Sequence, residues 1–248
     1  MPTRTLVLVV TLSLLASPAF AQIENISVEG STDLVTHYMF RGVAFTDRPS
    51  AQPSLTLGFG DSGFSFNIWG SWALKQRSIQ EAGDELDFTV SYDRNLGEQY
   101  ENVGLTVGII QYTFPSLPKG DRLTTEFYAG LSLDVPASPS LTVYRDLGQF
   151  DYWYVNGSIG HEVQLTPEGN VTLGVSADIG YSDATDKFEF NHAGASVSIG
   201  VSHSYFSLAP TIGIIRRTEE IEASDFDFHR TKDEQNRVWG GVSLGFAF

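Results

Sequence analysis

The sequence contains no cysteine, only two methionines, and half as many lysines and arginines as aspartates and glutamates. Without cysteine the chain forms no disulfide bond, so its stability must come from hydrogen bonding and packing. The formal net charge is −15 at pH 7. Because such an acidic chain repels phosphate groups, we predict no nucleic-acid partner.

Long apolar runs are also scarce. The segment from Leu6 to Leu15 follows Arg4 and precedes Ala19 and Ala21. It is shorter than the roughly 20 residues that a spanning helix needs, and this arrangement is typical of a secretory signal peptide. We therefore predict a cleaved signal peptide over residues 1–21 and a mature domain over residues 22–248.

The chain is rich in glycine and aromatic residues, and its last segment alternates strictly. Over residues 237–248, Val238, Val242, Leu244, Phe246 and Phe248 share one face, while the other face is mostly small or polar. A period of two predicts a strand. Because a strand edge exposed to lipid leaves backbone groups unpaired, we predict that this strand closes a barrel by pairing with the first one.

Eleven earlier segments show the same period. They cover approximately residues 28–40, 55–59, 64–72, 85–93, 103–109, 126–133, 141–144, 152–159, 171–179, 195–202 and 207–214. With the last segment they make an even number, as in single-chain bacterial barrels. The sequence thus predicts an all-β fold, a single twelve-stranded antiparallel transmembrane β-barrel preceded by the signal peptide.

Connection lengths and aromatic positions predict the same fold. Connections after even-numbered strands, such as 60–63 and 203–206, are mostly short, whereas those after odd-numbered strands include 41–51, 75–84, 113–124, 182–192 and 216–236. This asymmetry is typical of outer-membrane barrels, with long loops outside the cell. Outward aromatics predict two girdles, one of Phe59, Phe64, Tyr92, Phe206, Phe246 and Phe248 and one of Tyr38, Phe40, Trp72, Phe127, Trp153 and Tyr181. A soluble β-sandwich, the alternative, predicts neither pattern.

Several stretches resemble one known family. Residues 30–42 begin with Ser-Thr-Asp after a glycine and end with Arg-Gly, and residues 52–55, 68–72, 85–88 and 111–115 continue the likeness. Together they resemble the TorF-type porins of Gram-negative bacteria. The resemblance implies an outer-membrane barrel of largely uncharacterised function, with no catalytic residues to carry over.

Charged side chains on the inward face are the candidate functional residues. They are predicted to line the lumen and comprise Glu29, Asp33, His37, Arg41, Lys75, Asp87, Asp93, Glu126, Glu162, Asp178 and Arg237. Asp33, His37 and Arg41 recur every fourth residue and are expected to form a stripe on one strand. Such charges can set ion preference, or they can pair with one another and fill the barrel.

The predicted function is passive diffusion of small hydrophilic solutes, with a preference for cations. Twelve strands enclose more room than the eight-stranded barrels that side chains fill, and small inward residues such as Gly174, Ser176, Ser196, Ser198, Gly200, Gly241, Ser243 and Gly245 should leave space along one wall. Acids on the first and fourth strands favour cations. The expected partners are outer-membrane lipid and, through the strand ending at Phe248, the barrel-assembly machinery.

Two alternatives remain open at this point. Long loops, above all 216–236, could plug a structural or receptor barrel. A lipid-modifying hydrolase would need a serine and a histidine within reach of each other. No histidine precedes a serine at the two-residue spacing that shares a strand face, although residues from different strands could still meet.

Because the acids in 216–236 lack the EF-hand spacing, we predict no metal, and we also predict no cofactor.

Overall fold

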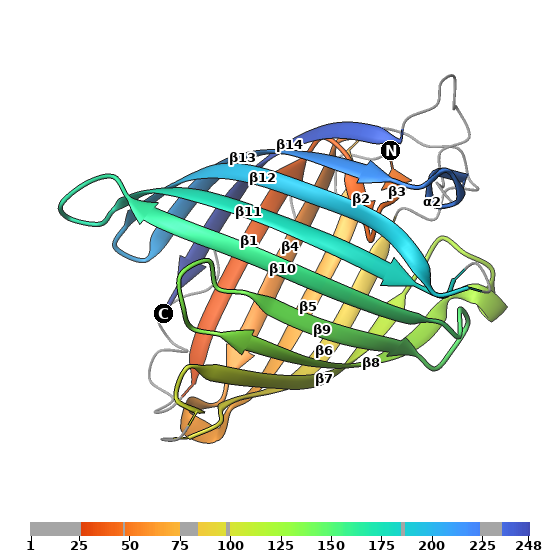
Figure 1. Ribbon diagram of the computed structural model, residues 1–248, viewed down its shortest axis with the longest axis horizontal. Coiled ribbons are helices and arrows are strands. Elements are labelled where there is room, and N and C mark those ends of the chain that lie inside the picture. Colours follow the sequence, from red (N-terminus) through yellow and green to blue (C-terminus); the bar gives the residue numbers. More distant parts are fainter. Residues whose placement is uncertain (1–25, 47, 75–83, 98–99, 185–186, 224–234) are drawn as a thin grey trace, which may run out of the picture.

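The computed structural model describes residues 26–46, 48–74, 84–97, 100–184, 187–223 and 235–248. Twelve antiparallel strands close into one barrel, as Figure 1 shows. In chain order they are β1 (Ser27–Val35), β4 (Ser50–Gly58), β5 (Phe64–Ala73), β6 (Glu85–Asn95), β7 (Val103–Thr113), β8 (Leu123–Leu133), β9 (Ser140–Asp146), β10 (Trp153–Gln164), β11 (Val171–Ser182), β12 (Glu189–His203), β13 (Phe206–Arg217) and β14 (Asn236–Ala247). The predicted fold class is confirmed. None of the helices in the described residues is long and apolar enough to span a membrane.

The first and last strands close the barrel. β14 pairs antiparallel with β1, and Asp33 lies opposite Ser243. The backbone N–H of Phe248 donates to the carbonyl of Val28 at 2.9 Å, and Val28 returns the bond at 3.1 Å. This ladder leaves no open sheet edge, which is the condition for a β-structure in lipid.

The outer surface carries an apolar band with aromatic residues at both ends. Aliphatic side chains such as Val107, Ile159 and Val197 are exposed around the middle. Exposed rings lie near the strand ends, among them Phe59, Phe64 and Phe206 at one end and Trp72, Phe127, Trp153 and Tyr181 at the other. An apolar belt flanked by aromatic girdles is the surface of a transmembrane barrel.

The two ends of the barrel differ in their connections. At one end, called here the short-turn end, β12 and β13 are joined through Ser204 and Tyr205, and the turn after β4 ends at Gly63 with φ 79°. A Cβ atom at Gly63 would lie 2.4 Å from the carbonyl oxygen of Asp93. The other end, called the long-loop end, carries the short helix α2 (Glu219–Ala223). The connection from β13 to β14 is longer than that from β12 to β13, as predicted, but the connection predicted over 182–192 is shorter, because β11 ends at Ser182 and β12 already begins at Glu189.

The prediction for the first strand is wrong beyond residue 35. β1 ends at Val35, and β2 (Tyr38–Phe40) and β3 (Val43–Thr46) form a separate hairpin inside the long-loop end (Figure 1). Tyr38 is 5% exposed and Ala44 is fully buried. Tyr38 and Phe40 therefore do not belong to the outer girdle, and the connection predicted over 41–51 folds partly into the barrel.

The turn of this hairpin explains why the chain reverses there. Arg41 has φ 51° and Gly42 has φ 85°. Two consecutive residues with positive φ are the signature of a type I′ turn, which joins two strands with only two residues. Because a non-glycine residue at positive φ is disfavoured, contacts of the Arg41 side chain must hold this turn.

Candidate functional site

The hairpin packs against the inward face of β5–β10, called here the aromatic wall. Tyr38, Phe45, Tyr112 and Phe114 form a buried cluster, with Phe40, Val43, Trp69, Ile110 and Leu117 packed around it. The ring centroids of Tyr38 and Trp69 are 5.5 Å apart, and those of Phe40 and Tyr112 are 5.9 Å apart. Each such pair adds about 0.5–1.5 kcal/mol beyond its buried area, so the hairpin is a fixed part of the lumen.

Arg41 anchors the tip of the hairpin to the aromatic wall. Its guanidinium donates to both carboxylate oxygens of Glu126, at 2.7 and 2.6 Å, and to the hydroxyl of Tyr152 at 2.8 Å. Burial lowers the pKa of Arg41, but Tyr152 and Glu126 outweigh this effect and the pKa is raised. The guanidinium also lies 4.3 to 4.7 Å from the ring centres of Tyr154, Tyr144 and Phe40. Arg41 therefore stays charged, and its guanidinium is held by Glu126, Tyr152 and the neighbouring rings.

A second contact ties the tip to the opposite side. Arg217 on β13 donates to the carbonyl of Gly42 at 2.8 Å. A Cβ atom at Gly42 would lie 3.0 Å from Ile221 and 3.1 Å from His192, so this position has no room for a side chain. The hairpin thus reaches from the aromatic wall to β12 and β13 across the long-loop half of the lumen.

The acids on β6 lie under the hairpin. The hydroxyl of Tyr38 donates to Glu85 at 2.6 Å, and burial together with the charge of Glu85 raises the pKa of Tyr38. Glu85 is 2% and Asp87 is 7% exposed. Among the described residues, one carboxylate oxygen of Asp87 has no hydrogen-bond partner. Glu85 and Asp87 point inward, as predicted, but the hairpin covers them. Asp93 on the same strand is exposed, so the expectation that acids of the fourth strand bias the lumen stays a prediction.

Free volume lies along the remaining wall. The inward face of β11–β14 and β1, called the serine-glycine wall, borders cavities of about 730, 420 and 300 Å³. Ser243 borders the first and second cavities, while Ser176 and Ser196 border the first and third. The first cavity therefore shares lining residues with each of the other two. Most of the small inward residues that the sequence indicated border them.

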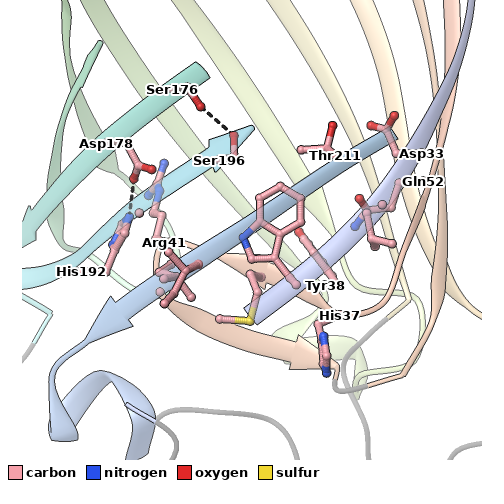
Figure 2. Close-up of a pocket in the computed structure, with 18 of the residues that line it drawn as sticks. Asp33, His37, Tyr38, Arg41, Gln52, Ser176, Asp178, His192, Ser196 and Thr211 are labelled. Carbon is pink, nitrogen blue, oxygen red and sulfur yellow. Dashed lines mark hydrogen bonds and ion pairs between the residues drawn. The ribbon is translucent and has the colours of Figure 1, made fainter. Parts of the chain in front are cut away.

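Polar and aromatic groups line the first cavity, the largest of the three (Figure 2). Asp178 and His192 point toward one another, with 2.9 Å between Oδ2 and Nε2. Asp33 and Gln52 lie on the opposite side. Trp239 also borders the cavity, and its indole lies across Gly213, whose Cβ position is 2.5 Å from the ring. The absence of a side chain at Gly213 lets the indole lie against the wall.

The predicted lumen residues separate into groups. Asp33, His37, Arg41 and Asp178 border the first cavity, Glu29 the second and Glu162 the third. Asp87, Glu126 and Arg237 are buried, and Asp93 is exposed near the short-turn end. Lys75 lies outside the described residues, as does the predicted signal peptide. Asp33, His37 and Arg41 do not form a stripe on one strand, because β1 ends before His37 and Arg41 lies at the hairpin tip.

Sequence reasoning missed the pairing of Asp178 with His192. The two residues meet across β11 and β12, close to a register shift at Gly180 and Tyr181. Only the register of neighbouring strands decides such contacts. Among the described residues, Nδ1 of His192 has no hydrogen-bond partner.

Comparison with known proteins gives the family. Residues 23–214 match the family described as "Bacterial protein of unknown function (Gcw_chp)". The chain belongs to the Gcw_chp family. No curated protein sequence matches it. The likeness to TorF-type porins stays a prediction, since the family description names no such protein.

Two solved porins share the fold. The KdgM porin is similar with a TM-score of 0.54 and 10% identity, over 90% of this chain and 99% of that one. The NanC porin is similar with a TM-score of 0.52 and 9% identity, over 89% and 98%. At such identities the likeness concerns the fold alone. Together with the apolar belt, this fold points to the outer membrane.

Proposed function

We propose that this Gcw_chp protein is a porin-like channel for passive diffusion of small hydrophilic solutes. The observation that carries the proposal is the series of cavities along the serine-glycine wall, of which the first shares lining residues with each of the other two. This series of cavities runs from beneath the hairpin toward the short-turn end. Hydroxyl groups and the backbone at glycine residues line it, and a hydrated solute can pass along them. No catalytic residue is part of this proposal.

The charges along this route favour cations. Among the described residues, the carboxylates of Asp33 and Glu29 have no hydrogen bond or ion pair. Among the described inward arginines, Arg217 is 1% and Arg237 is 7% exposed, and Arg41 is held by Glu126. Unpaired acids beside covered cations give the route a negative potential, which raises the local concentration of cations.

Reversal potentials in planar bilayers test this proposal. With a KCl gradient across the membrane, the wild-type protein should conduct and prefer potassium. Asp33→Asn and Glu29→Gln should each reduce the preference, while Asp61→Asn, which removes the same charge from an exposed turn, should leave it unchanged. Anion selectivity in the wild type, or equal effects of Asp33→Asn and Asp61→Asn, would contradict the cation preference.

A plugged structural or receptor barrel is the second candidate. The observation that favours it is the hairpin tip, which contacts both Glu126 and Arg217 and so bridges the lumen. A variant in which a short glycine linker replaces residues 38–46 separates the two functions. If the wild-type protein is silent in bilayers and this variant conducts, the hairpin is a plug and the channel proposal fails.

A further inference from the structure

The first cavity, the largest of the three, has the size and lining of a small-molecule site. Its volume of about 730 Å³ falls within the roughly 300–1,000 Å³ typical of ligand pockets. Trp69, Trp239 and Tyr154 border it beside Gln52 and Thr211. Because aromatic faces and a few polar groups surround one space, the cavity can hold a solute as well as let it pass.

The charges in this cavity are unbalanced. Asp33 has no ion pair among the described residues, and the side chain of Asp178 is 38% exposed although it also contacts His192. The cation Arg41 already binds Glu126 and Tyr152. The two acids approach from different sides (Figure 2), so an organic cation would find a carboxylate at either end of the space.

An aromatic face is available to the same cation. Trp239 lies with one side of its indole against Gly213 and also borders the cavity. Trp is the aromatic side chain that attracts cations most strongly, through the negative potential of the ring face. Arg41 shows that this lumen holds a cation in such surroundings, since its guanidinium lies over the rings of Tyr144 and Tyr154 beside Glu126.

We propose that the cavity is a binding site for small organic cations, with Asp33 as the counter-ion and Trp239 as the ring face. The inference deepens the proposed channel function, because it names the class of solute that the lumen retains. Quaternary ammonium ions such as choline have the matching chemistry, a positive charge spread over methyl groups that can contact an indole.

Calorimetry on the purified protein tests the site without any need for conduction. Choline is titrated into the protein in a polyoxyethylene detergent that carries neither choline nor sugar. Its neutral isostere, 3,3-dimethylbutan-1-ol, is titrated in parallel, and glucose serves as a neutral saccharide. We expect choline to bind, and to bind more tightly than both neutral compounds.

Three variants locate the binding. Asp33→Asn should weaken choline binding about tenfold, since it removes the charge and keeps the shape. Trp239→Leu should weaken it about two- to fivefold, the size of a cation-π contact at a partly exposed site. Asp61→Asn is the matched control and should bind as the wild type does. The heat-dependent shift of folded barrels on gels verifies that each variant is folded.

Each other outcome overturns the inference. Absence of choline binding, equal binding of choline and its neutral isostere, or Asp33→Asn binding like the wild type would show that no cation site exists there. Tighter binding of glucose would make the cavity a saccharide site. Potassium conductance is measured separately, so a conducting channel that fails to bind choline refutes only this inference, whereas a silent barrel that binds choline refutes only the channel.

Discussion

The two walls of the lumen have the same strand geometry but differ in the size of their inward side chains. On the aromatic wall, Tyr128, Tyr144 and Tyr154 lie opposite one another on β8, β9 and β10, with neighbouring ring centroids 5.6 and 5.7 Å apart. On the serine-glycine wall, Ser176 and Ser196 lie opposite one another on β11 and β12. Large inward residues thus create a surface that the hairpin covers, and small ones leave the volume that remains.

This difference between the walls shows that an internal hairpin can pack against one side of the lumen without filling the whole lumen. The hairpin buries its rings against β5–β7 and its arginine against β8–β10. Toward β13, the hairpin tip accepts a hydrogen bond from Arg217. Stability on one side and space on the other therefore arise from the choice of inward residues, while the backbone ladder is continuous around the barrel.

The largest effect is expected when the hairpin loses its anchor. Arg41→Ala leaves the Glu126 carboxylate, 1% exposed, buried without its cation, which costs about 3–5 kcal/mol. We expect a lower free energy of unfolding and a higher conductance, because the tip is released from the aromatic wall. Urea unfolding in lipid vesicles and single-channel recording measure the two quantities.

Arg145→Ala is the matched control. Arg145 pairs with Asp151, whose side chain is 74% exposed, and an exposed pair contributes only about 0–1 kcal/mol. If the two arginine variants lost the same free energy and conducted alike, Arg41 would not be the anchor of the hairpin.

The next largest effect is expected when a charge is placed on the outer face of β14, compared with the same charge on its inner face. Leu244 is 49% exposed on the outer face of β14, and Leu244→Arg places a charge in lipid at a cost of about 2–4 kcal/mol near the midplane. Ser243→Arg should be milder because Ser243 borders the cavities. Folding yields in vesicles measure both, and equal losses would mean that the inward and outward faces of β14 are assigned wrongly.

A third pair of variants tests along which of the two walls solutes pass. Ser196→Trp adds a large side chain at a position that borders both the first and the third cavity, and we expect conductance to fall by about half or more because the route narrows. Tyr112→Phe removes only the hydroxyl that donates to Glu126 at 2.9 Å and should leave conductance unchanged. If conductance fell only in Tyr112→Phe, solutes would follow the aromatic wall.

The smallest effect concerns one buried hydrogen bond. Tyr38→Phe removes the hydroxyl that donates to Glu85, and the loss of such a bond costs about 1–3 kcal/mol when the acceptor stays buried. The free energy of unfolding should fall while ion selectivity stays as in the wild type. A changed selectivity would mean that the acids under the hairpin do face the solute route.

Most of the barrel could be predicted because lipid imposes one rule on every strand. Outward positions must be apolar, so residues such as Val197, Ile212 and Leu244 mark the period of two and fix the inward set. The strand count, the closure of β14 on β1 and the wall of small residues all follow from this alternation.

The hairpin could not be found by the same rule. Tyr38 and Phe40 continue the alternation of β1, and an apolar side chain satisfies the pattern whether it faces lipid or a protein core. Arg41 and Gly42 between two short apolar segments are the one local signal of a two-residue turn. The pairings of Arg41 with Glu126 and of His192 with Asp178 depend on the register between distant segments, which no local pattern encodes.

Thiol accessibility tests most directly whether solutes pass along the serine-glycine wall. Because the chain has no cysteine, Ser243→Cys and Ser71→Cys each introduce a single thiol. Ser243 borders two cavities, and Ser71 on β5 is fully buried. During bilayer recording, a charged methanethiosulfonate reagent should reduce the conductance of Ser243→Cys and leave Ser71→Cys unchanged. Block of Ser71→Cys with no effect on Ser243→Cys would contradict the proposed route.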